Sequence, residues 1–165
     1  MLHQVILGNG SNLGDREENL RLAMAEIQKF ATITAHSAIY ETNPWGFTDQ
    51  PAFLNQVLVV ETQLDPFDLL DALKRTEKRI GRTPTFRYGP RVIDIDILFF
   101  DQLVLEDEKL IIPHPKIAER AFVLIPLDEL VPQFIHPVLH RSIHKMLSEV
   151  NQDGVRLYKK VEQTE

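Results

Sequence analysis

Apolar residues recur along the chain with two different periods, and these periods predict alternating strands and helices. Residues 4–8 are a short apolar run typical of a strand, and residues 16–31 then carry apolar side chains at helical spacing. The apolar positions of this predicted helix are Leu20, Ala23, Met24, Ile27 and Phe30. Asp15, with Glu18 three residues later, is a suitable N-cap, so we expect the helix to begin there.

The next segments predict two strands and a second helix. Residues 32–42 are rich in Thr and Ile and predict one strand, and residues 53–64 predict another. Asp65 and Pro66 form an N-cap and first-turn pair for a helix that Gly81 would end. The inward face of this helix is expected to carry Phe67, Leu70, Leu73 and Ile80.

Glu77 falls on that same face of the second predicted helix, although it is a carboxylate. A buried carboxylate requires a partner, because moving an unpaired charge out of water costs free energy. We therefore expect Glu77 to lie near a rim or near a functional site.

The remaining segments complete a βαββαβ order. Residues 92–100 predict a fourth strand, residues 101–114 a hairpin-like excursion, and residues 115–130 and 141–150 short helices. This order predicts an α+β fold with a ferredoxin-like, antiparallel core and additional C-terminal elements. A length of 165 residues suits one domain, 1–165.

Composition narrows the classes of function. The chain has no cysteine, which excludes a disulfide framework or a thiolate metal site and fits a cytoplasmic protein. The formal net charge of −6 disfavours nucleic acid or an anionic membrane as a partner. No secretory signal or membrane-spanning run is recognisable, so we expect a cytoplasmic monomer whose partners are small molecules.

Two aspartates interrupt the fourth predicted strand, whose sequence is VIDIDILFF. Alternation places Asp94 and Asp96 on one face, and it places Ile93, Ile95, Ile97 and Phe99 on the other. One interpretation is an amphipathic strand with a solvated face. The other is a Mg²⁺ site, because the cation would relieve the repulsion between neighbouring carboxylates. Residues 74–91 favour an anion nearby, since they hold seven basic residues and one acidic residue.

Other patterns are weaker. Gly8, Gly10 and Gly14 miss the spacing of a dinucleotide-binding loop and are typical of a strand-to-helix turn. The three residues His136, His140 and His144 are spaced by four, which suits a surface helix better than a zinc site. The aromatic pair of the NPWGF segment, Trp45 and Phe47, could pack in a loop or, with Asn55, line a pocket for a flat heterocycle.

The segments GSNLGD, YETNPWG, DQPAFLNQV, GPRVIDIDILFF and ERAF after PHP occur in order from about residue 5 to residue 130. In this combination they resemble the 6-hydroxymethyl-7,8-dihydropterin pyrophosphokinase family of folate biosynthesis. The resemblance implies a ferredoxin-like core. It also implies a reaction in which the pterin hydroxymethyl oxygen attacks the β-phosphorus of ATP and AMP leaves. No fused aldolase or synthase domain is recognisable, so a stand-alone enzyme is expected.

The resemblance also implies roles on the nucleotide side. Asp94 and Asp96 would bind two Mg²⁺ ions that bridge the ATP phosphates, and Arg82 and Arg91 would contact phosphates and stabilise developing charge. Further positions implied to contact ATP are Glu77, Arg87, Tyr88, Ile97, Lys109, His114 and Arg120. Such transfers depend mainly on positioning and charge neutralisation, and no general base is assigned.

On the pterin side, the resemblance implies a pocket that stacks a flat ring. The positions implied to line it are Gly10, Thr42, Pro44, Trp45, Phe53, Asn55 and Phe122. The ring would lie between Phe53 and Phe122, a contact that contributes about 0.5–1.5 kcal/mol per aromatic pair beyond burial. Trp45 would belong to a loop that closes over the site together with residues 82–90.

Some positions depart from the family pattern. Pro84 stands where a second arginine is frequent, and Arg87 would substitute for that arginine. Tyr88 replaces a frequent tryptophan, Pro115 replaces an aromatic residue, and Lys109 replaces an arginine. The last change removes a bidentate phosphate contact. The departures concern ATP contacts and loop closure, whereas the aspartate pair and pterin positions match.

Three other interpretations are considered. A ferredoxin-like RNA-binding module would require a basic sheet face with stacked aromatic residues, which we do not find. A catalytically impaired relative that binds pterin or nucleotide would be favoured by loss of an aspartate, and both are present. A different Mg²⁺-dependent phosphotransferase would share the metal site but not the pterin positions.

Overall fold

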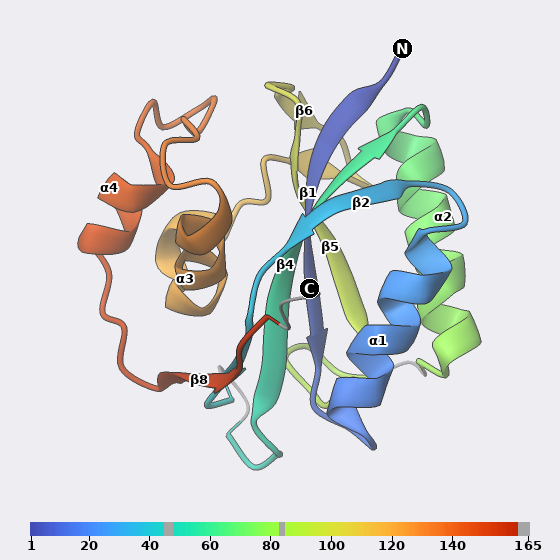
Figure 1. Ribbon diagram of the computed structural model, residues 1–165, viewed down its shortest axis with the longest axis vertical. Helices are drawn as coiled ribbons and strands as arrows, with labels where there is room; N and C mark the ends of the chain where they lie inside the picture. Colours follow the sequence, from blue (N-terminus) through green and yellow to red (C-terminus); the bar gives the residue numbers. More distant parts are fainter. Residues whose placement is uncertain (45–47, 83–84, 162–165) are drawn as a thin grey trace.

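The computed structural model describes residues 1–44, 48–82 and 85–161. In these ranges an antiparallel sheet lies between two layers of helices (Figure 1). The strands are β1 (His3–Ser11), β2 (Thr32–His36), β3 (Ile39–Thr42), β4 (Phe53–Thr62), β5 (Asp94–Phe100), β6 (Leu105–Glu106), β7 (Ile111–Ile112) and β8 (Val155–Lys159). The helices are α1 (Arg16–Ile27), α2 (Pro66–Ile80), α3 (Ala121–Leu130) and α4 (Ile143–Ser148), with the 3-10 turn η1 (Ile117–Glu119) before α3.

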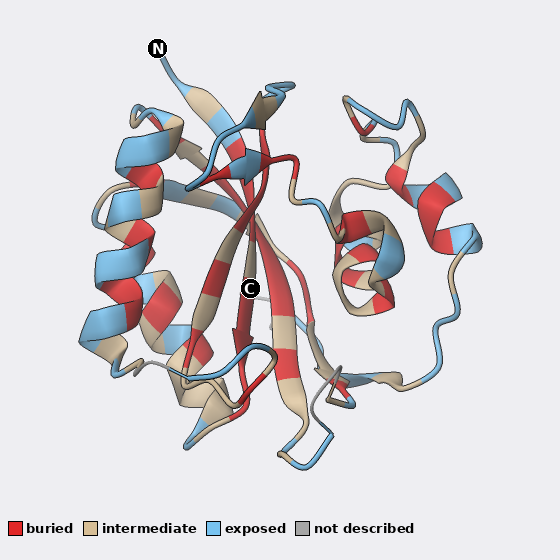
Figure 2. Ribbon diagram, turned by 180° about the vertical axis from the view of Figure 1, so that it is seen from behind, coloured by how far each residue is buried: buried red, intermediate tan, exposed pale blue. Residues whose placement is uncertain are grey.

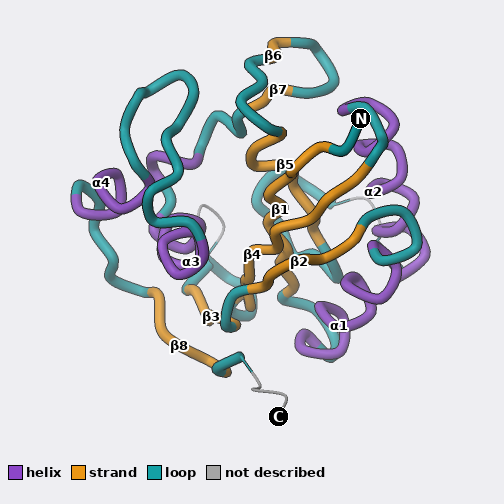
Figure 3. The backbone as a smooth tube through the Cα atoms, turned by 45° about the horizontal axis from the view of Figure 1, so that its top comes forward, coloured by secondary structure: helices purple, strands orange, loops and turns teal. Residues whose placement is uncertain are grey.

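The main sheet has the strand order β5-β1-β4-β3-β8, and β2 also pairs with β4. Each of these pairings is antiparallel. Strands β6 and β7 form the predicted hairpin, which projects beside β5, whereas β8 lies next to β3 at the other side of the sheet (Figure 3). The predicted mixture of helices with an antiparallel sheet is therefore confirmed.

Both long helices begin where their capping residues predict, and α2 also ends at its predicted cap, whereas α1 ends at Ile27, before the end of the predicted range 16–31. Asp15 accepts a hydrogen bond from the backbone N–H of Glu18 at the start of α1, and Asp65 caps α2 in the same way. Gly81 ends α2 in the left-handed region, with φ at +116°, where a residue with a Cβ would be strained.

The inward face of α2 matches the prediction at Leu70, Leu73 and Ile80, which pack in or against the core, but not at Phe67. Phe67 is 41% exposed, whereas Leu69 is fully buried and Leu73 and Thr76 follow it on the inner side. Two residues along a helix turn the side chain by about 200°, so Phe67 and Leu69 cannot both point inward. Glu77 is buried, as expected, and only 2% exposed.

Two strand predictions also need correction. The strand predicted at 32–42 is divided into β2 and β3, because Ser37 breaks the regular pattern by bonding both backbone groups of Val57. Strand β8 was not predicted. Its five residues, VRLYK, are largely exposed and too few to give a clear apolar pattern, so the sequence did not identify it.

The sheet has a separate apolar cluster on each face (Figure 2). One cluster packs against α1 and α2, and the other packs against α3 and α4. A register shift in the pairing of β1 with β5 leaves Leu98 as an extra residue, and Phe99 therefore joins the α3 cluster. The prediction that Phe99 shares a face with Ile95 and Ile97 is wrong because of this bulge.

Within the described ranges, no helix combines the length and the apolar composition needed to cross a bilayer. Leu105–Glu106 and Ile111–Ile112 are too short to change the main sheet, but they position the segment that leads to His114.

The corrected face of α2 is testable by truncating its two candidate core residues. Leu69→Ala should lower the free energy of unfolding by about 2–5 kcal/mol, because it opens a cavity in a packed core. Phe67→Ala, at an exposed position on the same helix, should cost much less. Urea denaturation of both variants measures the difference, and equal losses would contradict the assigned face.

Candidate active site

The cavity that gathers most predicted site residues opens at one end of the sheet. Its volume is about 340 Å³. Strands β1 and β3 end there and β4 and β5 begin there, so antiparallel pairing brings four chain segments to one place. The predicted site residues that line it are Gly10, Thr42, Phe53, Asn55, Arg82, Arg87, Tyr88, Arg91, Asp94, Asp96, His114, Arg120 and Phe122.

Asp94 and Asp96 lie on the cavity side of β5. Their Cα partners on β1 are Gly10 and Gly8, so no side chain of the neighbouring strand stands directly beside either carboxylate. Burial, followed by the charges of Asp94 and Glu77, raises the pKa of Asp96 from 3.8 to about 7. Burial and the neighbouring carboxylates therefore oppose a negative charge on Asp96.

Glu77 joins α2 to this pair. Its carboxylate accepts hydrogen bonds from the backbone N–H of Ile95 and from Arg82 Nη1, both at 2.8 Å. The same Arg82 nitrogen lies 3.4 Å from Asp94 Oδ1. Burial raises the pKa of Glu77, and the Asp94 charge adds to this, while the Ile95 hydrogen bond and Arg82 act against it. Glu77 thus has the partners that its inward position requires, and it holds Arg82 beside the aspartates.

His114 is uncharged at neutral pH. Burial, reinforced by the Arg120 charge, lowers its pKa from 6.5 to about 4. Its Nδ1 accepts the backbone N–H of Lys116 at 3.1 Å, which assigns the proton to Nε2. A neutral imidazole with a protonated Nε2 can donate one hydrogen bond to an anion in the cavity.

A second cavity, of about 270 Å³, adjoins the first. The two share Lys74, Asp96 and His114. Ile97 and Lys109, both predicted on the nucleotide side, line this second cavity rather than the first. Lys74 is a lining residue of both cavities that the sequence analysis did not select, although it belongs to the basic segment identified there.

Five of the predicted pterin residues, Gly10, Thr42, Phe53, Asn55 and Phe122, line the first cavity. Asn55 Nδ2 donates to Thr42 Oγ1 at 3.1 Å, across the pairing of β3 with β4. A Cβ on Gly10 would lie 2.8 Å from Asn55 Oδ1, so glycine is needed for the amide to approach β1. Phe53 and Phe122 line the same cavity from β4 and α3.

Some predicted site residues are placed differently or not described. Pro44 is not among the residues that line either cavity, and Trp45 and Phe47 lie outside the described residues. Arg87 and Tyr88 line the first cavity, but Arg87 Nη2 donates to the Tyr88 hydroxyl at 2.9 Å. Arg87 therefore contacts its neighbour at the cavity, and its substitution for a phosphate-binding arginine stays a prediction.

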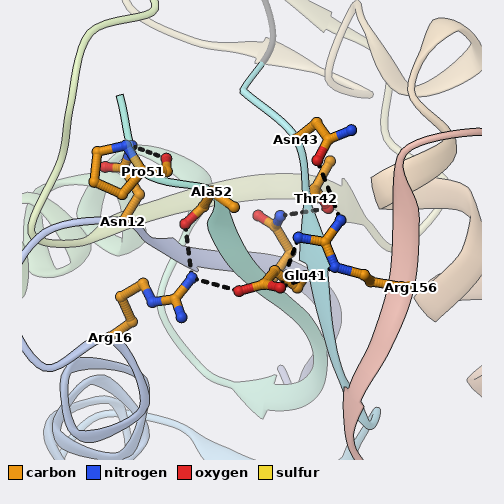
Figure 4. Close-up of polar contacts among 9 residues, drawn as sticks. Asn12, Arg16, Glu41, Thr42, Asn43, Pro51, Ala52 and Arg156 are labelled. Atoms are coloured by element: carbon orange, nitrogen blue, oxygen red, sulfur yellow. Dashed lines mark hydrogen bonds and ion pairs between the residues drawn. The ribbon is translucent and has the colours of Figure 1, made fainter. Parts of the chain in front are cut away.

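Sequence reasoning missed Asn12, which connects two segments at the cavity. It is 1% exposed, and its Nδ2 donates to Gln50 Oε1 at 2.8 Å. The same Nδ2 donates to the Pro51 carbonyl at 3.0 Å (Figure 4). Its Oδ1 accepts the backbone N–H of Arg91 at 2.7 Å. Gln50 in turn donates to the Tyr88 carbonyl at 2.7 Å. Asn12 is the asparagine of the GSNLGD segment, but the prediction for this segment used only its glycines.

The three spaced histidines do not form a site. His136 Nδ1 accepts backbone N–H groups of Val138 and Leu139, His140 has φ at +57°, and His144 lies in α4 beside Asp128. Among the described residues, no group of three or more His, Cys, Asp or Glu side chains is arranged to hold a metal ion. The expected surface helix is also absent at His136, which is buried in a turn.

Comparisons with known proteins agree on one family. Residues 6–132 match the family model described as 7,8-dihydro-6-hydroxymethylpterin-pyrophosphokinase (HPPK). The chain is 44% identical over 152 residues to the 2-amino-4-hydroxy-6-hydroxymethyldihydropteridine pyrophosphokinase of Bacillus subtilis, covering 91% of this chain and 87% of that protein. It is 41% identical over 145 residues to the enzyme of the same name from Aquifex aeolicus, covering 88% and 91%.

A solved structure is also similar. A crystal structure of Plasmodium falciparum HPPK-DHPS superposes with a TM-score of 0.74 at 19% identity, covering 90% of this chain and 45% of that one. At this identity the likeness concerns the fold alone. This chain therefore spans less than half of that longer protein.

Asn12→Ala should destabilise the protein. The change leaves the buried N–H of Arg91 without its acceptor, which costs about 1–3 kcal/mol. Denaturant unfolding measures the loss, and an unchanged midpoint would contradict the role of the amide. Asn19→Ala is the matched control, because it also removes a bridging amide but leaves Gln50 and Arg91 paired.

The raised pKa of Asp96 predicts a pH dependence of stability. The pKa of Asp96 is about 7 in the folded protein and near 3.8 in the unfolded chain. The stability that this shift contributes is therefore complete below about pH 4 and is lost as the pH rises through 7. In metal-free protein, Asp96→Asn should lose much less stability between pH 5 and pH 8 than the wild type does. At pH 8 the variant should therefore gain stability relative to the wild type. Unfolding in EDTA at pH 5 and pH 8 measures it, with the exposed Asp68→Asn as the control. An identical pH dependence in wild type and Asp96→Asn would rule out the shift.

Proposed function

Because the chain belongs to the 7,8-dihydro-6-hydroxymethylpterin-pyrophosphokinase family, we propose how its cavity carries out the transfer that defines this family. The chain transfers pyrophosphate from ATP to hydroxymethyldihydropterin, a step of folate biosynthesis. The observation that supports the assignment of roles is one cavity lined both by the two carboxylates of β5 and by two aromatic rings, Phe53 of β4 and Phe122 of α3.

Asp94 and Asp96 are suited to hold Mg²⁺, which we propose as two ions bound with the ATP phosphates. Mg²⁺ prefers one or two carboxylates, with phosphate and water oxygens completing an octahedron. The raised pKa of Asp96 fits this role, because the pair carries a charge conflict that a divalent cation relieves. When bound, the ions neutralise charge on the phosphates and orient them.

The neighbouring cationic and neutral donors complete the phosphate site in this proposal. Arg82, held by Glu77 at 2.8 Å, and Arg91 face the triphosphate and stabilise the charge that develops on transfer. In this proposal His114 donates from Nε2 to a phosphate oxygen. The Arg120 guanidinium lies 5.5 Å from the Phe122 ring centroid, so Arg120 adjoins a ring that we assign to the pterin pocket. Ile97 and Lys109 line the second cavity, which we assign to the nucleoside part of ATP.

The pterin lies between Phe53 and Phe122 in our assignment, with Thr42 and Asn55 at its edge. Two rings that face one cavity bind a flat heterocycle by apolar burial and offset stacking. Asn55 and Thr42 are already hydrogen-bonded to each other, so the amide is oriented before the substrate binds. We retain Pro44 and Trp45 as proposed pterin contacts from the family pattern.

The proposed transfer needs no dedicated general base on the protein. The hydroxymethyl oxygen forms a bond to the β-phosphorus of ATP, the bond from that phosphorus to the bridging α-phosphate oxygen breaks, and AMP leaves. The hydroxyl proton passes to solvent or phosphate. The protein contributes mainly by placing the oxygen and phosphorus in line and by neutralising charge.

The finer features of the architecture are also proposals. We infer that β1, α1, β2 with β3, β4, α2 and β5 are a ferredoxin-like core, since the order β5-β1-β4-β3 is that of a split βαβ pair. We further propose that residues 1–165 act as one pyrophosphokinase domain and as a monomer in the cytoplasm.

AMP formation tests the metal and the aspartates together. With ATP and 6-hydroxymethyl-7,8-dihydropterin, wild type should form AMP with Mg²⁺ and not with EDTA. Asp96→Asn should lower kcat/KM by about a hundredfold or more, the equivalent of about 2.7 kcal/mol in the barrier. The control Asp68→Asn, an exposed residue of α2, should retain the wild-type rate.

The possible results separate the alternatives. AMP formed at full rate in EDTA would contradict the Mg²⁺ site. A wild-type protein that binds the pterin but forms no AMP would favour a catalytically impaired relative. AMP formed without the pterin would indicate a different phosphotransferase.

A further inference from the structure

A carboxylate on the reverse side of the sheet joins three parts of the chain that are far apart in sequence. Glu41 immediately precedes Thr42, which lines the substrate cavity. Successive side chains of a strand point to opposite faces, so Glu41 points away from that cavity. Figure 4 shows Arg16, the first residue of α1, and Arg156, in β8, both directed at the Glu41 carboxylate.

The two arginines occupy different oxygens of this carboxylate. Arg16 Nη1 lies 2.8 Å from Glu41 Oε2, whereas Arg156 Nε and Nη2 lie 2.9 and 2.7 Å from Oε1. The Glu41 side chain is only 19% exposed. The Arg16 hydrogen bond, followed by that of Arg156, lowers the pKa of Glu41 against the effect of burial. The carboxylate is therefore ionised and bound on both sides, by the partly buried Arg16 and by Arg156, whose side chain is 51% exposed.

The same arginines hold both ends of the connection between β3 and β4. Arg16 Nη1 also donates to the carbonyl of Ala52 at 2.9 Å, immediately before β4. At the other end, Arg156 Nη1 donates to Asn43 Oδ1 at 3.1 Å, and the Asn43 N–H donates to the Gly154 carbonyl at 3.0 Å. Glu41 thus joins in one cluster Asn43, which follows Thr42, and Ala52, which precedes Phe53.

We propose that Glu41, clamped by Arg16 and Arg156, is a positioning residue for the pterin pocket. It keeps the end of β3 and the start of β4 at a fixed separation, so that Thr42 and Phe53 face the cavity together. The clamp includes β8, which lies beyond residues 6–132 that match the family model. The inference rests on the proposed placement of the pterin at Thr42, Phe53 and Asn55.

The proposal predicts an effect confined to one substrate. The residues assigned to ATP come mainly from α2, β5 and the segments near His114, whereas the partners of the Glu41 carboxylate are Arg16 of α1 and Arg156 of β8. Loosening the clamp should therefore weaken pterin binding while ATP binding stays nearly unchanged. A loss of general stability would instead affect both substrates.

The experiment compares Glu41→Gln and Arg156→Met with Glu17→Gln. Glu17 pairs with Lys159 at 2.5 Å, so the control also removes an ion pair between the α1 region and β8, but it leaves Asn43 and Ala52 held. Each clamp variant should raise the KM for the pterin about tenfold, equivalent to about 1.4 kcal/mol, and change the KM for ATP by less than about twofold. The double variant should show little further loss, because both changes break one cluster.

Direct binding of the pterin without ATP separates this inference from the proposed function. Calorimetric titration should give about tenfold weaker binding for Glu41→Gln than for wild type. Equal affinities of the two would overturn the positioning role alone. A wild-type protein that does not bind the pterin would overturn the proposed pocket itself. Parallel increases in both KM values, or the same shift in Glu17→Gln, would also overturn the inference.

Discussion

The pairing of β5 with β1 is the constraint on which the site depends. It sets Asp94 and Asp96 opposite two glycines, on the face of the sheet that also carries α3. Their charges are thereby held side by side at the edge of an apolar cluster, and burial raises the pKa of Asp96 to about 7. The remaining groups compensate this concentrated charge: Arg82 lies against Asp94, and Glu77 holds Arg82 while also binding the backbone of β5. A cation and a polyphosphate would complete a balance that the protein alone leaves incomplete.

The carboxylates and the aromatic rings of the cavity are supported by different parts of the fold. Asp94 and Asp96 lie on β5, which meets α2 through Glu77 and Ile95. Thr42 and Phe53 lie on β3 and β4, where Glu41 binds its two arginines. Asn12 links the two parts, because it bonds to Pro51 on one side and to Arg91 on the other. Our proposals therefore assign the phosphate site and the pterin site to different supports within one cavity.

The differences between the predicted and observed structure have local physical causes. The inward face of α2 was assigned from Phe67, a large apolar residue, but the packing of Leu69 turns that position to solvent. The bulge at Leu98 moves Phe99 to the other cluster, and simple alternation cannot anticipate an extra residue. Strand β8 is a short, largely exposed strand at the edge of the sheet, and its pairing with β3 is a long-range contact that no local pattern predicts.

The sequence by itself determined the helices α1 and α2, the antiparallel strands around them, the family, and the residue types at the site. These features follow from local chemistry: capping side chains, apolar periodicity, and the close spacing of Asp94 and Asp96 on one strand face. Only the tertiary structure decided which residues support the site from a distance. Asn12, Glu41 and Arg156 acquire their partners across gaps of 38, 25 and 115 residues. No local pattern encodes such contacts, because they exist only when antiparallel pairing brings the ends of separate strands together.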